Sequence, residues 1–367
     1  MSLTEPGGVL QSCPGADAIL DRAAGGERLS AAEAVEIYKK ARLLDVGRTA
    51  GLIRNRLHPE GIVSFVVDRN INYTNVCQSA CLFCAFYRSE GDDDAYVLSN
   101  KEIMDKIEEL VAAGGTQVLI QGGLHPRLGL GYFETLFREI RRRFGVHIHS
   151  LSPPEVVHLA RLEGLTVRDV LRRLKKAGLD SLPGGGAEIL VDRVRRVISP
   201  RKINAQEWLD VMIAAFEIGL FGTATMMFGS VDTPEERVEH MRRIREVQDR
   251  TGGFTAFIPW TYQPGNNALG GKQAPVVDYL RVLAVSRIFL DNIVNIQASW
   301  VTQGAKVGQV ALAFGANDFG GTMLEENVVR AAGASHRVLR DDILRAIRDA
   351  GYTPVQRTTD YKIIETF

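Results

Sequence analysis

The chain has 367 residues, of which 45% are hydrophobic and 24% are charged, and this is enough for one large α/β domain or two smaller ones. Its 44 Lys and Arg residues balance its 44 Asp and Glu residues, so no basic field is available to attract nucleic acid. The sequence has no apolar run of the roughly 20 residues that a membrane span requires and no pattern typical of a secretion signal.

The first 60 residues predict a leader followed by a helical extension. Residues 1–16 contain several Gly and Pro residues and predict a mobile leader, in which Cys13 stands alone and without an expected role. From Asp17 to about Arg56 the pattern is helical, and Ser30-Ala-Ala-Glu33 has the spacing of a capping box. We expect these helices to cover the bottom of a barrel.

Three of the four cysteines lie close together, directly after a predicted strand. Cys77, Cys81 and Cys84 have the spacing C-x3-C-x2-C, and such short spacers let three thiolates converge on one centre. Three thiolates suit a [4Fe-4S] cluster with one iron open to a small-molecule ligand. The alternatives are a zinc site completed by a distant histidine, or three unlinked buried thiols. Clustered thiols without a disulfide framework predict a reducing, cytoplasmic location.

Strand and helix patterns then alternate along the chain. Eight strands are predicted, at 62–73, 117–121, 146–151, 179–182, 221–228, 254–259, 294–300 and 313–317. Their rhythm predicts an α/β fold with a (β/α)8 barrel of the TIM type over residues 61–335. Residues 336–367 predict an extension packed on the barrel, with a helix at 340–350 and an edge strand near 361–364. The alternative is an open barrel of six strands with a separate C-terminal lobe.

Polar side chains occupy alternate positions on several predicted strands. Outward-facing apolar neighbours turn the intervening residues into the lumen, which an ordinary barrel fills with branched apolar side chains. The inward set comprises Gln121, His147, His149, Thr223, Thr225, Asn295, Gln297 and Ser299. Each residue alone is compatible with a satisfied hydrogen bond in the core, but the set predicts a polar ligand deep inside the barrel.

Two glycine clusters also follow predicted strands, where glycine lets a backbone approach a ligand closely. They are Gln121-Gly122-Gly123 and Gly184-Gly185-Gly186. Neither fits the dinucleotide-binding fingerprint or a P-loop.

The cysteine motif, with Phe83 before the last cysteine, resembles the signature of the radical S-adenosylmethionine (SAM) enzymes. In that superfamily SAM chelates the open iron, and one electron cleaves it to methionine and a 5′-deoxyadenosyl radical. The resemblance implies two cofactors, a [4Fe-4S] cluster on Cys77, Cys81 and Cys84, and SAM.

The same resemblance implies a SAM-binding set. Gly122 and Gly123 match the segment whose carbonyls bind the SAM amino group. Ser152, Glu155 and Glu188 match positions that contact the ribose or the methionine part. Phe86 and Tyr87 are expected to face the adenine, and Gln121 and Thr225 complete the expected cofactor-binding residues.

Longer stretches narrow the resemblance to the menaquinone and deazaflavin branch of the superfamily, over roughly residues 60–357. They include Asp68-Arg-Asn-Ile-Asn-Tyr-Thr-Asn-Val-Cys77, Leu151-Ser-Pro-Pro-Glu155 and Ser299-Trp-Val-Thr-Gln-Gly304. Within the branch, the chain is most similar to the cyclic dehypoxanthinyl futalosine synthases of the futalosine route to menaquinone. This implies that dehypoxanthine futalosine loses hydrogen from C4′ of its ribose, closes a ring onto its benzoate, and then loses an electron and a proton.

His149 and Asp318 are our candidates for the residue that accepts the final proton. The resemblance also implies an electron donor such as flavodoxin or ferredoxin. Alternative functions are an aminofutalosine synthase, a deazaflavin-forming enzyme that couples tyrosine to a pyrimidine, and, more distantly, a non-enzymatic iron–sulfur electron carrier.

Overall fold

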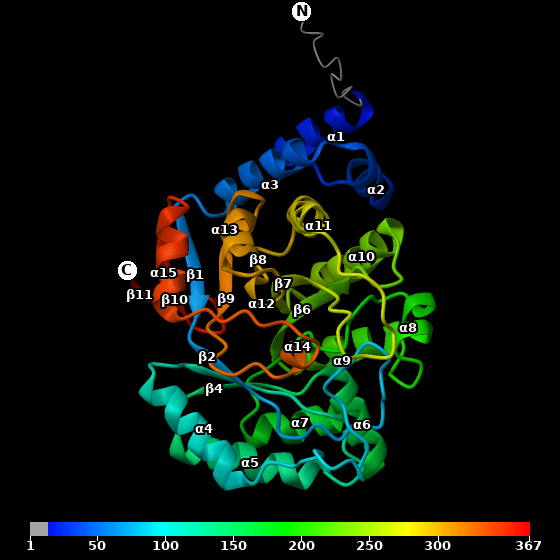
Figure 1. Cartoon of the computed structure of the whole chain (residues 1–367), viewed down its shortest axis with the longest axis vertical. Helices are drawn as coiled ribbons and strands as arrows, with labels where there is room; N and C mark the ends of the chain where they lie inside the picture. The colour runs from blue at the N-terminus through cyan, green and yellow to red at the C-terminus, as the bar shows by residue number, and fades with distance from the viewer. Residues whose placement is uncertain (1–13) are drawn as a thin grey trace, which may run out of the picture.

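Parallel strands form the centre of the molecule (Figure 1). The computed structural model describes residues 14–367, and its largest sheet has seven strands that follow the order of the chain. Every neighbouring pair in this sheet is parallel, which requires a crossover between successive strands. The strands are β2 (Asp68–Ile71), β3 (Gln117–Ile120), β4 (His147–Ser150), β5 (Ser181–Leu182), β6 (Phe221–Phe228), β7 (Phe254–Thr261) and β8 (Asn295–Ile296).

Strands of a second sheet lie between the two edges of the first. β1 (Ile62–Val66) leads into β2 and pairs in parallel with β9 (Asp318–Gly321). A bridge between Gln297 and Asp318 connects β9 with the end of β8. The predicted α/β barrel of the TIM type is therefore confirmed, as a curled seven-stranded sheet with β9 and β1 between its edges.

The last two predicted strands differ in their boundaries from the strands in the structure. β8 ends at Ile296, and the chain enters the short helix α12 (Trp300–Gln303), where a strand to residue 300 was predicted. Residues 313–317 are not a strand, because α13 (Ala305–Ala313) ends there and the strand begins at Asp318. The segment Asp318–Gly321 contains two glycines and becomes a strand through its pairing with β1.

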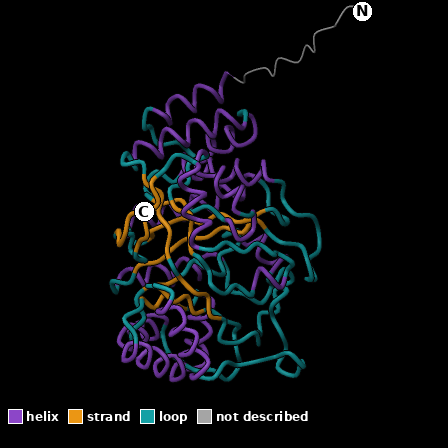
Figure 2. The backbone as a smooth tube through the Cα atoms, turned by 60° about the vertical axis from the view of Figure 1, so that its left-hand side comes forward, coloured by secondary structure: helices purple, strands orange, loops and turns teal. Residues whose placement is uncertain are grey.

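Helices lie above and below the strands in Figure 2. α4 illustrates how they form: it begins with a capping box of Ser99 and Glu102, and it buries one face made of Ile103, Met104, Ile107 and Leu110. The helices between β2 and β8 are α4 (Asn100–Ala112), α5 (Leu130–Arg143), α6 (Pro153–Glu163), α7 (Val167–Ala177), α8 (Asp192–Ile198), α9 (Ala205–Glu217), α10 (Pro234–Thr251) and α11 (Val276–Phe289).

Three N-terminal helices pack on this outer layer, at the top of Figure 1. They are α1 (Pro14–Ala24), α2 (Ala31–Lys40) and α3 (Leu43–Leu57), and they contact α10, α11 and α13. Nη2 of Arg54 in α3 donates to the carbonyl of Ile62 (2.6 Å), and Nε2 of His58 lies 3.0 Å from the carbonyl of Val294. The end of α3 therefore lies at the bottom of the barrel, where the strands begin, while the helices also pack along its side. α1 also includes residues 14–16, which we had assigned to the leader, whereas residues 1–13 with Cys13 lie outside the described part of the chain.

The C-terminal segment adds a strand beside β1. α14 (Val328–Ala331) and α15 (Arg340–Asp349) precede β10 (Thr353–Arg357), which pairs in parallel with β1. β11 (Ile363–Thr366) then pairs with β10 in antiparallel fashion. The predicted C-terminal helix is confirmed and the edge strand begins two residues later than expected, but β10 was not predicted. Through β10 the C-terminal segment reaches the interior of the barrel.

Candidate active site

A cavity of about 390 Å³ extends from the cysteine loop into the barrel. Its wall contains every residue that the sequence suggested for cofactor or metal binding: Cys77, Cys81, Cys84, Phe86, Tyr87, Gln121, Gly122, Gly123, Ser152, Glu155, Glu188 and Thr225. Of the two candidate proton acceptors, His149 lines the cavity and Asp318 does not.

Arg88 folds the cysteine loop back on itself. Its backbone carbonyl accepts a hydrogen bond from the amide of Cys77 (3.0 Å), and its guanidinium donates to the carbonyls of Ala85 (3.1 Å) and Tyr87 (2.9 Å). Nε of the same side chain donates to Asp94 (2.6 Å). The chain's own hydrogen bonds therefore fix the path of the loop.

The three thiols fit an iron–sulfur cluster better than a single metal ion. Within residues 14–367, no three His, Cys, Asp or Glu side chains are placed to hold one ion. Ligands of a tetrahedral zinc ion must approach to roughly 4 Å of one another, whereas cluster cysteines bind separate irons and stand further apart. Burial raises the pKa of Cys81 to about 12 and also raises the pKa of Cys84, so both thiols require a cationic partner to ionise.

Gly122 and Gly123 pack directly against the cysteine loop. A Cβ atom on Gly123 would lie 2.1 Å from the carbonyl oxygen of Val76 and 2.9 Å from Cβ of Cys77. Oε1 of Glu155 holds the Gly122 amide (3.1 Å), and Oε2 accepts from the amide (2.7 Å) and hydroxyl (2.5 Å) of Ser152. Ser152 and Glu155 therefore start α6 and fix the Gly122 backbone with the same carboxylate.

Glu188 and Lys202 form a buried ion pair beside the cysteines. Nζ of Lys202 donates to Oε1 of Glu188 (3.0 Å), and Arg195 lies 3.6 Å from Oε2, which has no hydrogen-bond partner among the described residues. Burial opposes charge on Lys202, but Cys81 and Glu188 raise its pKa above the usual value. No local pattern links Lys202 to Glu188, so the sequence did not reveal it.

Unpartnered polar atoms mark the cavity as a place for a polar ligand. Oδ1 of Asn70, Oγ of Ser79 and Oε2 of Glu188 are buried without a hydrogen-bond partner in the described part of the chain, and all three residues line the cavity. Buried polar atoms are normally hydrogen-bonded. A ligand with several polar groups would satisfy them.

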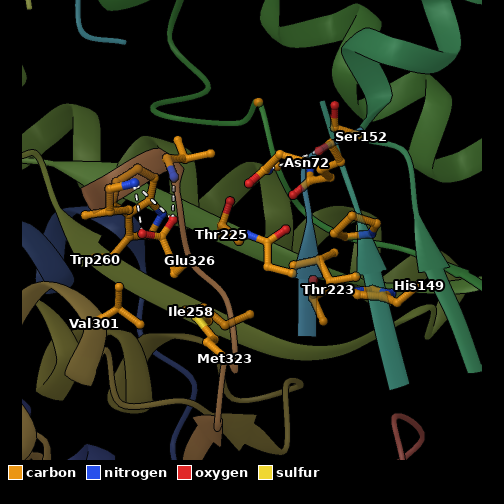
Figure 3. A pocket seen from close by; sticks show the side chains of 18 of the residues that line it. Asn72, His149, Ser152, Thr223, Thr225, Ile258, Trp260, Val301, Met323 and Glu326 are labelled. Atoms are coloured by element: carbon orange, nitrogen blue, oxygen red, sulfur yellow. Dashed lines mark hydrogen bonds between the residues drawn. The ribbon is translucent and has the colours of Figure 1, made fainter. Parts of the chain in front are cut away.

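Most of the predicted inward-facing residues are confirmed as cavity residues. Figure 3 shows Thr223, Thr225 and His149 on one side of the cavity, with Trp260 and Glu326 on the other. Gln121, Gln297 and Ser299 also line it. His147 and Asn295 do not, and the amide of Asn295 is satisfied by Thr255 (2.9 Å) and Asn317 (2.9 Å).

The C-terminal segment forms the floor of the cavity through Arg357, Thr359 and Tyr361, none of which the sequence suggested. Arg357 makes two hydrogen bonds to Asp318, of 2.5 and 3.0 Å, and its guanidinium lies 3.9 Å from the centre of the Tyr361 ring. Asp318 also accepts from Ser64 (2.6 Å). The carboxylate of Asp318 is thus occupied within the protein.

Two further groups near the floor have displaced pKa values. Burial raises the pKa of Asp68, which lines the cavity and accepts from the Met323 amide (2.9 Å), to about 6. Burial lowers the pKa of His149 to about 3, with His147 and Arg357 acting in the same direction. His149 is therefore a neutral imidazole at physiological pH.

The fold and the cavity define an enzyme of the radical SAM type. Residues 71–244 match the radical SAM superfamily, and residues 251–367 match the CofH/MqnC C-terminal region. The chain belongs to the radical SAM superfamily, whose members use SAM and a [4Fe-4S] cluster. No helix among the described residues is long and apolar enough to cross a membrane.

Relatives extend this similarity over nearly the whole chain. A cyclic dehypoxanthine futalosine synthase of Halalkalibacterium halodurans is 48% identical, over 96% of this chain and 95% of its own length. A synthase of the same name from Streptomyces coelicolor is 48% identical over 94% of this chain and 88% of its own. A 5-amino-6-(D-ribitylamino)uracil–L-tyrosine 4-hydroxyphenyl transferase of Methanosarcina mazei is 47% identical over 82% of each chain.

Solved structures agree on the fold. A methylornithine synthase superposes with a TM-score of 0.73 at 17% identity, over 92% of this chain and 97% of its own. The hydrogenase maturase HydG superposes with a TM-score of 0.74 at 16% identity, over 96% of this chain and 77% of its own. At these identities the likeness concerns the fold alone.

Proposed function

We propose that the protein cyclises dehypoxanthine futalosine in the futalosine route to menaquinone. The observation that carries this proposal is the 48% identity, over 96% and 94% of the chain, to two synthases with that reaction in their names. The cavity supports it, because it joins three thiols to a deep, partly polar interior whose floor holds the ion pair of Arg357 and Asp318.

The cysteine end of the cavity is proposed to hold the cofactors. Cys77, Cys81 and Cys84 would ligate the [4Fe-4S] cluster, which together with SAM supplies a 5′-deoxyadenosyl radical. The Gly122 carbonyl receives no hydrogen bond from the described residues and would accept one from the SAM ammonium group. Lys202 would bind the SAM carboxylate, and the free oxygen of Glu188 would accept from the ammonium or a ribose hydroxyl.

Several other cavity residues are proposed to orient SAM. Phe86 and Tyr87 present aromatic rings from the cysteine loop for the adenine, while Gln121 and Thr225 line the wall between the two ends. Ser152 and Glu155 act through the Gly122 backbone that they fix, because their polar atoms are already hydrogen-bonded to each other and to that backbone.

The deep end is proposed to hold the substrate. Arg357 lines the cavity, and its N–H groups that are not used by Asp318 and Thr358 would donate to the substrate carboxylate. Asp318 and Tyr361 keep its guanidinium in place. We therefore propose Asp318 as a positioning residue and His149 as the base that takes the final proton. The surrounding barrel excludes water and keeps the two reacting carbons close.

The reaction also requires an electron source. We propose flavodoxin or ferredoxin as the donor, and the cytoplasm as the location, because free thiols persist there. Both proposals follow from the chemistry of the three cysteines.

The test is an anaerobic reaction of the iron- and sulfide-reconstituted protein with SAM, a reductant and dehypoxanthine futalosine, followed by mass spectrometry. We expect 5′-deoxyadenosine together with a product that has lost two hydrogens. The Cys81→Ala protein is the control and should form neither.

The other outcomes separate the alternatives. Deoxyadenosine with unchanged substrate would contradict the proposed substrate, and tyrosine with 5-amino-6-(D-ribitylamino)uracil would be tried next, since a transferase with that name is 47% identical. The aminofutalosine synthase substrate would follow. A complete cluster without any deoxyadenosine would instead favour an electron carrier.

A further inference from the structure

A continuous set of hydrogen bonds joins β4 to β5 beside the cavity. His149 and Ser181 are direct partners across the two strands, and His147 lies two residues before His149, on the same face of β4. Oγ of Ser181 lies 2.6 Å from Nδ1 of His149 and 2.7 Å from Nε2 of His147. Nδ1 of His147 lies 3.8 Å from Oδ2 of Asp180.

The numbers of donors and acceptors, together with the nearby Asp180 carboxylate, indicate the direction of these hydrogen bonds. Ser181 has one hydroxyl hydrogen for two ring nitrogens, so one of the two rings must donate to it. The Asp180 carboxylate favours a hydrogen on Nδ1 of His147, which leaves Nε2 of that neutral ring as an acceptor. Ser181 then donates to His147 and accepts from Nδ1 of His149. Nε2 of His149 is left with a free lone pair.

The two ends of the same path differ in burial. His149 is 5% exposed and lines the cavity, and Ser181 is fully buried. The side chains of His147 and Asp180 are 23% and 26% exposed. No hydrogen bond from the described residues reaches Nε2 of His149, whose ring is seen in the cavity wall in Figure 3. The path therefore begins at the cavity and ends at the surface.

We propose that His149, Ser181 and His147 form an exit path for the proton that the substrate releases. The proposal rests on the proposed cyclisation, whose last step removes one electron and one proton from the closed ring. The electron passes to a one-electron acceptor of the iron–sulfur class. The C–H bond breaks, its electron pair restores the aromatic ring, and the proton binds Nε2 of His149.

Each later transfer forms one bond and breaks one bond. The Nδ1 hydrogen of His149 moves to Ser181, the Ser181 hydroxyl hydrogen moves to Nε2 of His147, and the Nδ1 hydrogen of His147 leaves to Asp180 or solvent. His149 touches the substrate and is a catalytic residue, whereas Ser181 and His147 act through it. Asp68 and Glu326 also carry carboxylates in the cavity wall. Their hydrogen bonds come from backbone amides, of Met323 in one case and of residues 328–330 in the other, and do not lead to a group that could pass a proton on.

The test compares Ser181→Ala and His147→Gln with the wild-type holoenzyme in single-turnover reactions. Glutamine keeps an acceptor for the Ser181 hydroxyl but cannot carry a proton. We expect deoxyadenosine to form at the wild-type rate in both variants, while aromatic product forms at least about tenfold more slowly, since a positioned base is typically worth 10²–10⁴-fold. His158→Gln is the matched control, because His158 bonds to the backbone carbonyl of His125 and does not line the cavity.

Two further measurements separate proton transfer from a structural role. Imidazole added to His147→Ala should restore product formation in proportion to its concentration, because the lost side chain was partly exposed. In the unloaded protein, ¹⁵N NMR should find the Nδ1–H tautomer of His149 in the wild type and a change of tautomer in Ser181→Ala.

Several results would overturn the path. Wild-type product rates in both Ser181→Ala and His147→Gln would do so, as would an Nε2–H tautomer of His149 in the wild type. If the wild type cleaves SAM and leaves the substrate unchanged, the proposed function is wrong, and the tautomer measurement still decides for or against the path.

Discussion

Glu188 has an unusual combination of properties for one residue. Its φ of 41° lies in the left-handed region, its side chain is 5% exposed, and one carboxylate oxygen has no hydrogen-bond partner in the described chain. A non-glycine residue in that region costs about 1–3 kcal/mol and persists where the surroundings enforce it. Because Lys202 and Cys81 lie beside it, the strained backbone coincides with the proposed SAM site.

Replacing Lys202 by methionine is expected to weaken SAM binding about tenfold to hundredfold. A charge-assisted hydrogen bond contributes about 1.5–3 kcal/mol, and the change also leaves Glu188 without its closest cation. Equilibrium dialysis of SAM against the cluster-loaded protein measures the effect. The SAM affinity of Lys202→Arg should lie between those of the wild type and Lys202→Met. Lys176→Met, at an exposed position, should bind SAM as the wild type does. Unchanged affinity in Lys202→Met would refute the assignment of this lysine.

At the scale of elements, the cysteine loop and the segment after β3 act as one unit. The Gly123 backbone approaches Val76 and Cys77 so closely that no side chain fits between them. Glu155, at the start of α6, holds the neighbouring Gly122 amide. The position of the cysteines therefore depends on β3 and α6 as well as on the loop itself.

Gly123→Ala is expected to displace the cysteine loop and impair cluster assembly. The added methyl group would overlap backbone atoms of Val76, and such overpacking typically costs about 1–3 kcal/mol. Iron and sulfide content after anaerobic reconstitution should fall well below that of the wild type, with the circular dichroism spectrum preserved. Gly145→Ala is the control, since a Cβ atom there meets nothing within 4 Å. A full cluster in Gly123→Ala would show that the loop adapts.

Periodic elements were predictable from the sequence, and elements defined by distant partners were not. β6 begins and ends where it was predicted, and α15 begins and ends within a residue of its predicted limits. The position of β9 was missed because Gly320 and Gly321 carry no strand signal until β1 pairs with them. Arg357 was missed as a site residue for a similar reason, since only the pairing of β10 with β1 brings it to the cavity.

At the scale of the whole molecule, buried neutral histidines make stability depend on pH. His240 is fully buried, and its Nδ1 accepts a hydrogen bond from the Leu190 amide (3.0 Å). Burial lowers its pKa to about 3, against a value of about 6.5 in the unfolded chain. The unfolded state therefore binds a proton first as the pH falls, and the stability present above about pH 6.5 is lost progressively toward pH 3.

His240→Gln is expected to make the free energy of unfolding less dependent on pH. Glutamine can still accept from the Leu190 amide but takes up no proton, which removes up to about 5 kcal/mol of acid destabilisation. Urea unfolding at pH 7 and pH 4.5 measures the difference in free energy of unfolding. His336→Gln, at an exposed position, is the control. If the free energy of unfolding depends equally on pH in His240→Gln and in the wild type, protonation of other groups causes the acid destabilisation.

The pairing of β1 also constrains the order of events during biosynthesis. Ile62 has Thr353 as its partner, so about 290 residues separate the first barrel strand from a strand that it needs. A ribosome working at 5–20 residues per second takes roughly 15–60 s to make that stretch. Through this time the edge of β1 that faces β10 has no strand partner. β10 also carries Arg357, which lines the floor of the cavity. The three cysteines are therefore synthesised long before the strand that completes the cavity.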